Sequence, residues 1–342
     1  MTPALAHGGQ ELTDENLWQA WRLTPEVTGA ILIALVIYLR GARRRDISAR
    51  GPTLGRHLMF FAGLASLFLA LQSPIDPMGE RLFLTHQIQH LLLRMLGPML
   101  IVLARPEGTL ISGLPRVLRR RVLAPMLANG PLNAVFRTLM LPWVAFGSFV
   151  GTLYFWQIPA VHNLALRVEP IHYLMHMTMI LAGFVFFAMI FDRRDGIAAA
   201  YHGKRVFLLF AAILSNIFLG ALTTLKTVVL YTAYDAPGRL FGTLPLDDES
   251  GGGYVIWVPA SMMCIIAIII VMRVWNDAEE RRILRRYEWS GSNTAALEFP
   301  QTAQELRLKV DTPNRRIAQS LGLGVMTLFV VVIATTISIV YR

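Results

Sequence analysis

Four histidines of this chain stand in two pairs that share one spacing. His86 and His90 lie in the apolar stretch LFLTHQIQHLLLRMLGPMLIVLA, and His172 and His176 lie in IHYLMHMTMILAGFVFFAMIF. In a helix, residues four apart lie on the same face, so each stretch presents two imidazoles along one stripe. Imidazole is a ligand for copper, zinc, iron and nickel. The pattern therefore predicts a metal or haem site between two helices.

The stretches that carry the pairs are long and apolar enough to cross a bilayer, where ionisable groups are costly. The whole chain has 342 residues, of which 54% are hydrophobic and 16% charged, and its mean hydropathy is +0.50. This composition excludes an ordinary soluble protein and predicts an all-α, polytopic transmembrane helical bundle. The eight predicted spans are residues 25–39, 54–71, 82–104, 138–156, 171–191, 206–230, 254–273 and 321–341.

The charges of the chain are arranged as in a membrane protein. A net charge of +10 could suggest a nucleic-acid partner, but the arginines gather in the loops after the first, third, fifth and seventh spans. By the positive-inside rule these loops are cytoplasmic and the N-terminus is extracytoplasmic. We therefore expect a multi-pass protein of the bacterial inner membrane, with the lipid bilayer and no nucleic acid as partner. The single cysteine, Cys264, excludes an internal disulfide.

Four regions follow from this topology. Residues 1–24 form an extracytoplasmic tail, 25–274 a seven-helix membrane domain with the histidine pairs, 275–320 a charged cytoplasmic linker, and 321–342 a C-terminal transmembrane helix. No basic and then apolar leader opens the sequence, so we expect no cleavable signal peptide.

The topology also sets the depth of the histidines. The third and fifth spans both run from outside to inside, and each histidine pair lies within about two turns of the outer end. All four imidazoles therefore lie at similar depth in the outer half of the membrane. The loops that hold His162 and the acidic run from Asp247 to Glu249 open on the same side, near the mouth of the predicted site.

Several functions remain open from the residues alone. One histidine pair could be a hydrogen-bonded helix contact, but two matched pairs favour a ligand site over a purely structural scaffold. A zinc-protease motif is absent from the sequence. Arg94, one turn below His90, favours a b-type haem because it could pair with a propionate, yet no second histidine pair lies at the inner face. A copper transporter would need polar groups below Arg94, where both spans are nearly all apolar.

Four motifs together resemble one family. They are HxxxHLLL followed by Pro98, then WxxPxxHxxAL from Trp156, then the second HxxxH, and DESGGGYVIWVP from Asp248. This combination, over about residues 25–275, resembles the polytopic, Bacillus-type CtaG family of cytochrome c oxidase assembly factors. Gly97 stands where the family usually has a first proline, Glu249 where it often has an amide, and the eighth span exceeds its usual seven.

The resemblance implies a role in building a haem–copper oxidase through copper supply to its metal centres. We expect an accessory factor or chaperone of respiratory chain biogenesis rather than an enzyme, with copper as its metal and haem b as the alternative. The expected partners are cytochrome c oxidase subunits or copper donor proteins, and the sequence leaves open whether the protein is a homo-oligomer. The metal-site residues that the resemblance implies are His86, His90, His172, His176, His162 and Asp248.

Overall fold

The computed structural model describes residues 13, 16–46, 51–192, 202–235, 239–289, 312–327 and 330–331. Within these ranges the regular structure is helical and no strand occurs, which confirms the predicted all-α bundle. The chain divides into two compact units, Met1–Arg273 and Val274–Arg342, and every histidine belongs to the first.

Most helices follow one another through short connections, but about 20 residues separate α13 from α14. In chain order they are α1 (Pro25–Asp46), α2 (Leu54–Gln72), α3 (Ile75–Gly79), α4 (Phe83–Leu91), the π-helical η2 (Leu92–Leu96), α5 (Gly97–Ala104), α6 (Glu107–Gly113), α7 (Arg116–Leu118), the π-helical η3 (Arg119–Leu123), α8 (Ala124–Ala128), α9 (Gly130–Leu139), α10 (Pro142–Gln157), α11 (Pro159–Arg167), α12 (Glu169–Ile190), α13 (His202–Thr224) and α14 (Pro245–Trp289). Short 3-10 turns are η1 (Leu17–Gln19), η5 (Thr232–Tyr234) and η6 (Leu240–Gly242). In the second unit, residues 312–327 are helical.

Six helical segments of the described chain are long and apolar enough to cross a membrane, and a seventh counts if a bent pair forms one span. The bent pair corrects the fourth predicted span, 138–156, because α9 and α10 meet at an angle of 69°. Pro142 causes the break, since a residue before proline is pushed out of the helical region and Leu141 is extended (ψ 131°). Of the eighth predicted span, only 321–327 and 330–331 lie among the described residues.

The sixth and seventh spans have other limits than the sequence suggests. The sixth helix ends at Thr224 rather than near Leu230. The seventh begins at Pro245 rather than Tyr254, so the acidic and glycine-rich run from Asp247 is helical instead of a loop. Proline in the first turn and aspartates beside the helix N-terminus both favour a helix start there.

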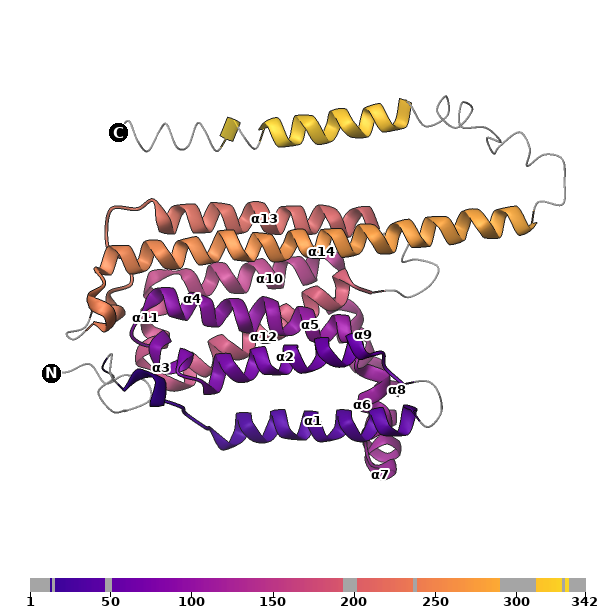
Figure 1. Cartoon of the computed structure of the whole chain (residues 1–342), viewed down its shortest axis with the longest axis horizontal. Coiled ribbons are helices and arrows are strands. Elements are labelled where there is room, and N and C mark those ends of the chain that lie inside the picture. The colour runs from indigo at the N-terminus through magenta and orange to yellow at the C-terminus, as the bar shows by residue number, and fades with distance from the viewer. Residues whose placement is uncertain are drawn as a thin grey trace. The chain divides into compact units, whose positions relative to one another are not determined.

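The third span, which consists of α4, η2 and α5, lies at the centre of the first unit (Figure 1). Its α5 packs on α2, and η2 and α5 both pack on α12. The wide π turn of η2 precedes Pro98, whose ring would clash with the carbonyl of Arg94 in a regular α-helix. Gly183 of α12 lets the helices approach closely here, because an added Cβ would lie 2.1 Å from the Arg94 carbonyl oxygen.

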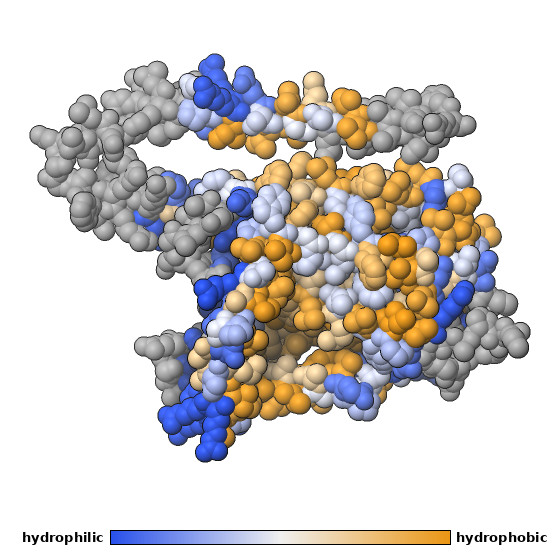
Figure 2. All heavy atoms as spheres, turned by 180° about the vertical axis from the view of Figure 1, so that it is seen from behind, coloured by the Kyte–Doolittle hydropathy of each residue, from blue (hydrophilic) through white to orange (hydrophobic). Residues whose placement is uncertain are grey.

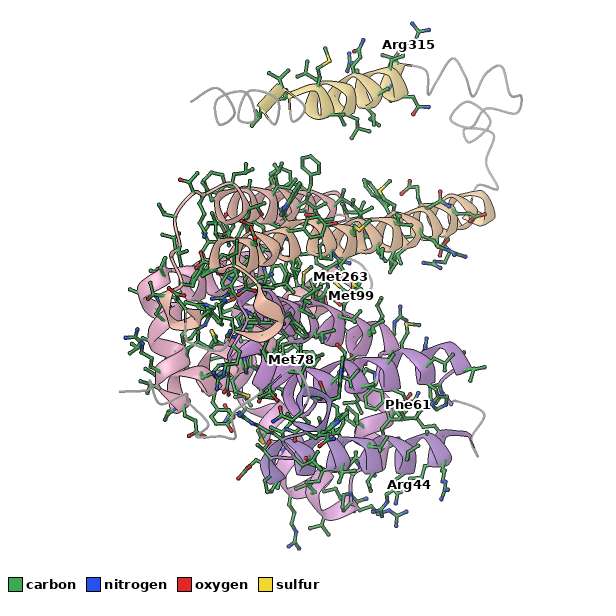
Figure 3. The ribbon with its side chains drawn as sticks, turned by 60° about the vertical axis from the view of Figure 1, so that its left-hand side comes forward. Arg44, Phe61, Met78, Met99, Met263 and Arg315 are labelled. Carbon is green, nitrogen blue, oxygen red and sulfur yellow. The ribbon has the colours of Figure 1, made fainter. Side chains whose placement is uncertain are left out.

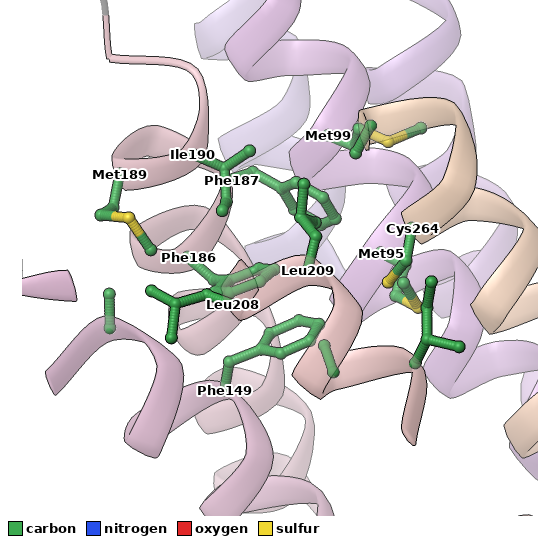
Figure 4. Close-up of a cluster of buried hydrophobic side chains, with 14 of the residues drawn as sticks. Met95, Met99, Phe149, Phe186, Phe187, Met189, Ile190, Leu208, Leu209 and Cys264 are labelled. Carbon is green, nitrogen blue, oxygen red and sulfur yellow. The ribbon is translucent and has the colours of Figure 1, made fainter. Parts of the chain in front are cut away.

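The interior below the histidines is apolar. Phe149 and Phe186 stack at 4.1 Å, and Cys264 lies beside Met95 among aliphatic side chains of the same cluster (Figure 4). Met99 and Met263 extend this cluster between α5 and α14 (Figure 3), whereas Arg44, exposed in the last turn of α1, donates to the carbonyl oxygen of Ser112 in α6. Hydrophobic residues also cover much of the face of the bundle that Figure 2 shows, as contact with lipid favours.

Candidate metal centre

The two histidine pairs of the sequence meet inside the first unit. His86 and His90 lie on α4 with their rings 4.3 Å apart, and His172 and His176 lie on α12 with theirs 4.4 Å apart. Between the helices, ring centroids are separated by 5.3 Å for His86 and His172 and by 5.6 Å for His90 and His176. All four side chains are buried. The structure thus brings together the four imidazoles that the helical spacing predicted to face one another.

Three of these rings converge closely enough to share one ion. One ring nitrogen from each of His86, His172 and His176 lies within 4.8 Å of the others. Nitrogens that bind one metal ion at about 2.1 Å are about 3.4 Å apart in tetrahedral geometry. Binding of an ion would therefore draw the three nitrogens closer together by up to about 1.4 Å. His90, whose ring lies 5.6 Å from that of His176, adds a fourth imidazole at the inner side.

Several imidazole nitrogens of the α4 pair have no hydrogen-bond partner among the described residues. They are Nε2 of His86 and both Nδ1 and Nε2 of His90, and all are buried. A buried polar atom without a partner costs about 1–3 kcal/mol, so such atoms in a folded protein call for a ligand, ion or water. A scaffold that buries histidines only for packing would satisfy these nitrogens. Their state fits a site that binds an ion.

His162 lies against this group in a different setting. Its ring, on α11, is 5.0 Å from that of His86, but both of its nitrogens have protein partners. Nδ1 is 2.9 Å from the carbonyl oxygen of Trp156, and Nε2 is 2.7 Å from the hydroxyl of Tyr234. Burial lowers the pKa of His162 to about 4, so the ring is neutral at physiological pH. His162 therefore borders the three convergent rings with both nitrogens engaged.

Tyr234 is the residue at this site that the sequence did not reveal. Its hydroxyl lies 2.5 Å from Nδ1 of His86 as well as 2.7 Å from Nε2 of His162. Burial raises its pKa well above 10, so the phenol keeps its proton. Tyr234 stands in the irregular connection between α13 and α14, where no periodicity points to a function.

Asp248 acts at the start of α4 and not among the three convergent nitrogens. Its carboxylate accepts hydrogen bonds from the backbone N–H groups of Phe83 (2.9 Å) and Leu84 (3.0 Å), and it pairs with Arg239 at 2.8 Å. The first N–H groups of a helix have no partner within the helix, so a carboxylate from elsewhere can cap them. Asp248 thereby holds the turn of α4 that leads to His86.

Comparison with known proteins agrees with the motifs. The model of the cytochrome c oxidase caa3 assembly factor family (Caa3_CtaG) matches residues 36–278. The chain belongs to this family. Family membership agrees with the multi-pass membrane bundle.

Three mycobacterial proteins are similar to this chain. An uncharacterized protein of Mycobacterium leprae is 23% identical over 283 residues, which cover 82% of this chain and 43% of that protein. Uncharacterized proteins of Mycobacterium bovis and Mycobacterium tuberculosis are each 24% identical over 81% of this chain and 42% of their own length. The chain thus spans about two fifths of these relatives. No solved structure matches it.

In this Caa3_CtaG family member, Arg94 has partners of its own inside the protein. Its guanidinium lies 3.6 Å above the ring of Phe149 and donates to the carbonyl oxygen of Phe149 at 3.1 Å. The cavity that touches Arg94 and His90 has a volume of about 20 Å³. That is room for about one water-sized species, whereas cofactor pockets usually measure about 300–1,000 Å³.

A larger cavity of about 660 Å³ lies on another side of α4. Its walls include Trp21, Leu84 and Ile88, and none of the five clustered histidines lines it. Of these two cavities, the one that touches His90 suits a bare ion better than a haem.

Proposed function

We propose that this protein is a membrane accessory factor that holds copper while a cytochrome c oxidase is assembled. His86, His172 and His176 would bind the ion, with His90 as the fourth ligand. The proposal is carried by the buried nitrogens of His86 and His90 that have no hydrogen-bond partner in the described chain, together with the convergence of the His86, His172 and His176 rings between two helices. Family membership supplies the connection to the oxidase.

The histidine ligands suit copper as an ion that the protein carries and passes on. Imidazole binds copper well, whereas thiolate and thioether groups select and retain Cu(I) more strongly. The convergent group of described residues contains histidines only, since Cys264 lies in the apolar cluster below it. Neutral nitrogen ligands without a thiolate suit an ion that is passed on to an oxidase subunit or received from a copper donor protein.

The proposal includes an orientation in the bacterial inner membrane. Helix α1 ends in Arg43, Arg44 and Arg45, and the connection after α6 carries another run of arginines. Basic connections favour the cytoplasm, so the N-terminus and the outer ends of α4 and α12 would be extracytoplasmic. The histidine site would then receive and deliver copper on the extracytoplasmic side, without a path through the apolar cluster below Arg94.

The test is elemental analysis by mass spectrometry of the detergent-purified protein beside a His90→Ala/His172→Ala variant. We expect near-stoichiometric copper in the wild type and loss of copper in the variant. His57→Ala is the matched control, because His57 contacts Tyr38 in a different part of the bundle and should leave the copper content unchanged. Iron in place of copper would indicate haem, and wild-type protein that binds no added copper would refute the proposal.

A further inference from the structure

The hydroxyl of Tyr234 connects two histidines from different helices. It lies 2.5 Å from Nδ1 of His86 on α4 and 2.7 Å from Nε2 of His162 on α11. The side chain of Tyr234 is almost completely buried, with 2% of its surface exposed. A phenol has one proton to donate, so only one of the two histidines can receive it.

The directions of these hydrogen bonds follow from the contact between His162 and the backbone of Trp156. The carbonyl oxygen of Trp156 can only accept, so His162 Nδ1, 2.9 Å away, must carry the N–H. A neutral imidazole has one N–H, so Nε2 of His162 is an acceptor and receives the proton of Tyr234. The oxygen of Tyr234 then has only its lone pairs left for His86. His86 must therefore donate through Nδ1–H, which leaves the lone pair on its Nε2.

That remaining nitrogen has no protein partner. Nε2 of His86 is buried and without a hydrogen bond in the described residues, and His86 belongs to the three converging rings. The hydrogen-bond directions from Trp156 through His162 and Tyr234 to His86 thus leave a lone pair on Nε2 of His86, where an ion can bind.

We propose that Tyr234, supported by His162, is a positioning residue that holds His86 in the tautomer and orientation needed to bind copper through Nε2. The inference rests on the proposed function, because it concerns how the same site is prepared. Partners of this kind fix the ring of a ligating histidine and raise its basicity, and their loss typically lowers metal affinity about 10–100-fold.

The turn that carries Tyr234 is held from two sides. Arg239 donates to the backbone carbonyl oxygen of Tyr234 at 2.8 Å and pairs with Asp248 of α14 at 2.8 Å. The side-chain oxygen of Asn163, on α11, accepts from the backbone N–H of Ala233 at 3.1 Å. Contacts with α11 and with Asp248 of α14, through Arg239, therefore hold the turn from which the hydroxyl of Tyr234 extends.

A matched pair of variants tests the inference, Tyr234→Phe and Tyr231→Phe. Tyr231 is also buried, and its hydroxyl donates to Gln157 and not to a histidine. Copper affinity, measured by competition with a chelator, should fall about 10–100-fold in Tyr234→Phe and change much less in Tyr231→Phe. The second readout uses metal-free protein with ¹⁵N-labelled histidine. NMR should show His86 protonated at Nδ1 in the wild type and in Tyr231→Phe, and a changed tautomer in Tyr234→Phe.

Variants of His162 provide an independent check if Tyr234→Phe folds poorly. Gln at position 162 can donate to the Trp156 carbonyl and accept from Tyr234, so His162→Gln should keep the affinity within a few-fold. His162→Leu can do neither and should lose affinity as Tyr234→Phe does.

Equal losses in both tyrosine variants, or in both position-162 variants, would show a general packing role and overturn the inference. An unchanged His86 tautomer in Tyr234→Phe would overturn it as well. Wild-type protein without copper affinity would refute the proposed function instead, while the NMR comparison would still decide whether Tyr234 sets the tautomer of His86.

Discussion

The role of Asp248 gives the sharpest test of how the site is built. Its carboxylate accepts the N–H groups of Phe83 and Leu84 at the start of α4 and pairs with Arg239. Oδ2 serves both Phe83 and Arg239, and Oδ1 serves Leu84. In Asp248→Asn one oxygen is replaced by an NH₂ group that faces donors, and the charge that balances Arg239 is lost.

The expected cost follows from these contacts. A hydrogen bond to a charged group contributes about 1.5–3 kcal/mol, and breaking a buried ion pair costs about 3–5 kcal/mol. Asn keeps one acceptor, and the side chain of Arg239 is 12% exposed, so water offsets part of the loss. We therefore expect Asp248→Asn to lower the stability of the folded protein by about 3 kcal/mol. Copper affinity should fall as well, because the cap is three residues before His86.

The assay is thermal unfolding in detergent with Asp247→Asn as the control. Asp247 is the exposed neighbour in the same first turn of α14, and its substitution should change stability by less than about 0.5 kcal/mol. Equal melting temperatures for the two variants would refute the capping role. Loss of copper without loss of stability would instead make Asp248 a ligand, as the motif resemblance implies.

Two further predictions concern helix contact and pH. Gly183→Ala should destabilise the bundle by about 1–3 kcal/mol and lower copper binding, because its Cβ would meet the Arg94 carbonyl and push α12 away from η2. Gly151→Ala is the control, since its Cβ would have no atom within 4 Å, and it should change neither the unfolding free energy nor copper binding. Equal effects of the two variants would contradict this prediction. The second follows from His162, whose folded pKa of about 4 lies below the ordinary value of 6.5. Because the unfolded state takes up a proton on this ring more readily, the free energy of unfolding is unaffected above about pH 6.5 and falls as the pH drops toward 4. The total loss is about 3 kcal/mol. Metal-free wild type should therefore lose more stability between pH 7 and pH 4.5 than His162→Gln, and parallel melting profiles would contradict the expectation.

The convergence of the histidines could be foreseen because it depends on local geometry. The spacing of His86 and His90 fixes a shared helix face, and the apolar runs around both pairs fix helices that span a bilayer. The opened helix at Gly97–Pro98 also follows from the chemistry of proline. The start of α14 could have been predicted from Pro245 and Asp247, which are typical of a first helical turn, but the glycines after them suggested a loop.

The contacts that prepare the site could not be predicted in the same way. Tyr234 lies 148 residues from His86, and Asp248 lies 165 residues from Phe83. Neither residue belongs to a periodic pattern, and the roles of both depend on how α11, α13 and α14 pack. The placement of His162 between Trp156 and Tyr234 likewise depends on the turn between α10 and α11. Residues that orient other residues leave little trace in a single sequence when tertiary packing brings them together.

The long separation between α4 and Asp248 has a consequence for biosynthesis. A ribosome makes the histidine pairs of α4 and α12 well before it reaches Tyr234 and Asp248. Until those residues emerge, the start of α4 lacks its cap and His86 lacks the hydroxyl beside Nδ1. The nascent chain therefore passes through a stage with four histidines but an unfinished site. Copper should be bound at full affinity only after α14 has entered the membrane, so chains that stall before residue 248 would bind the ion more weakly.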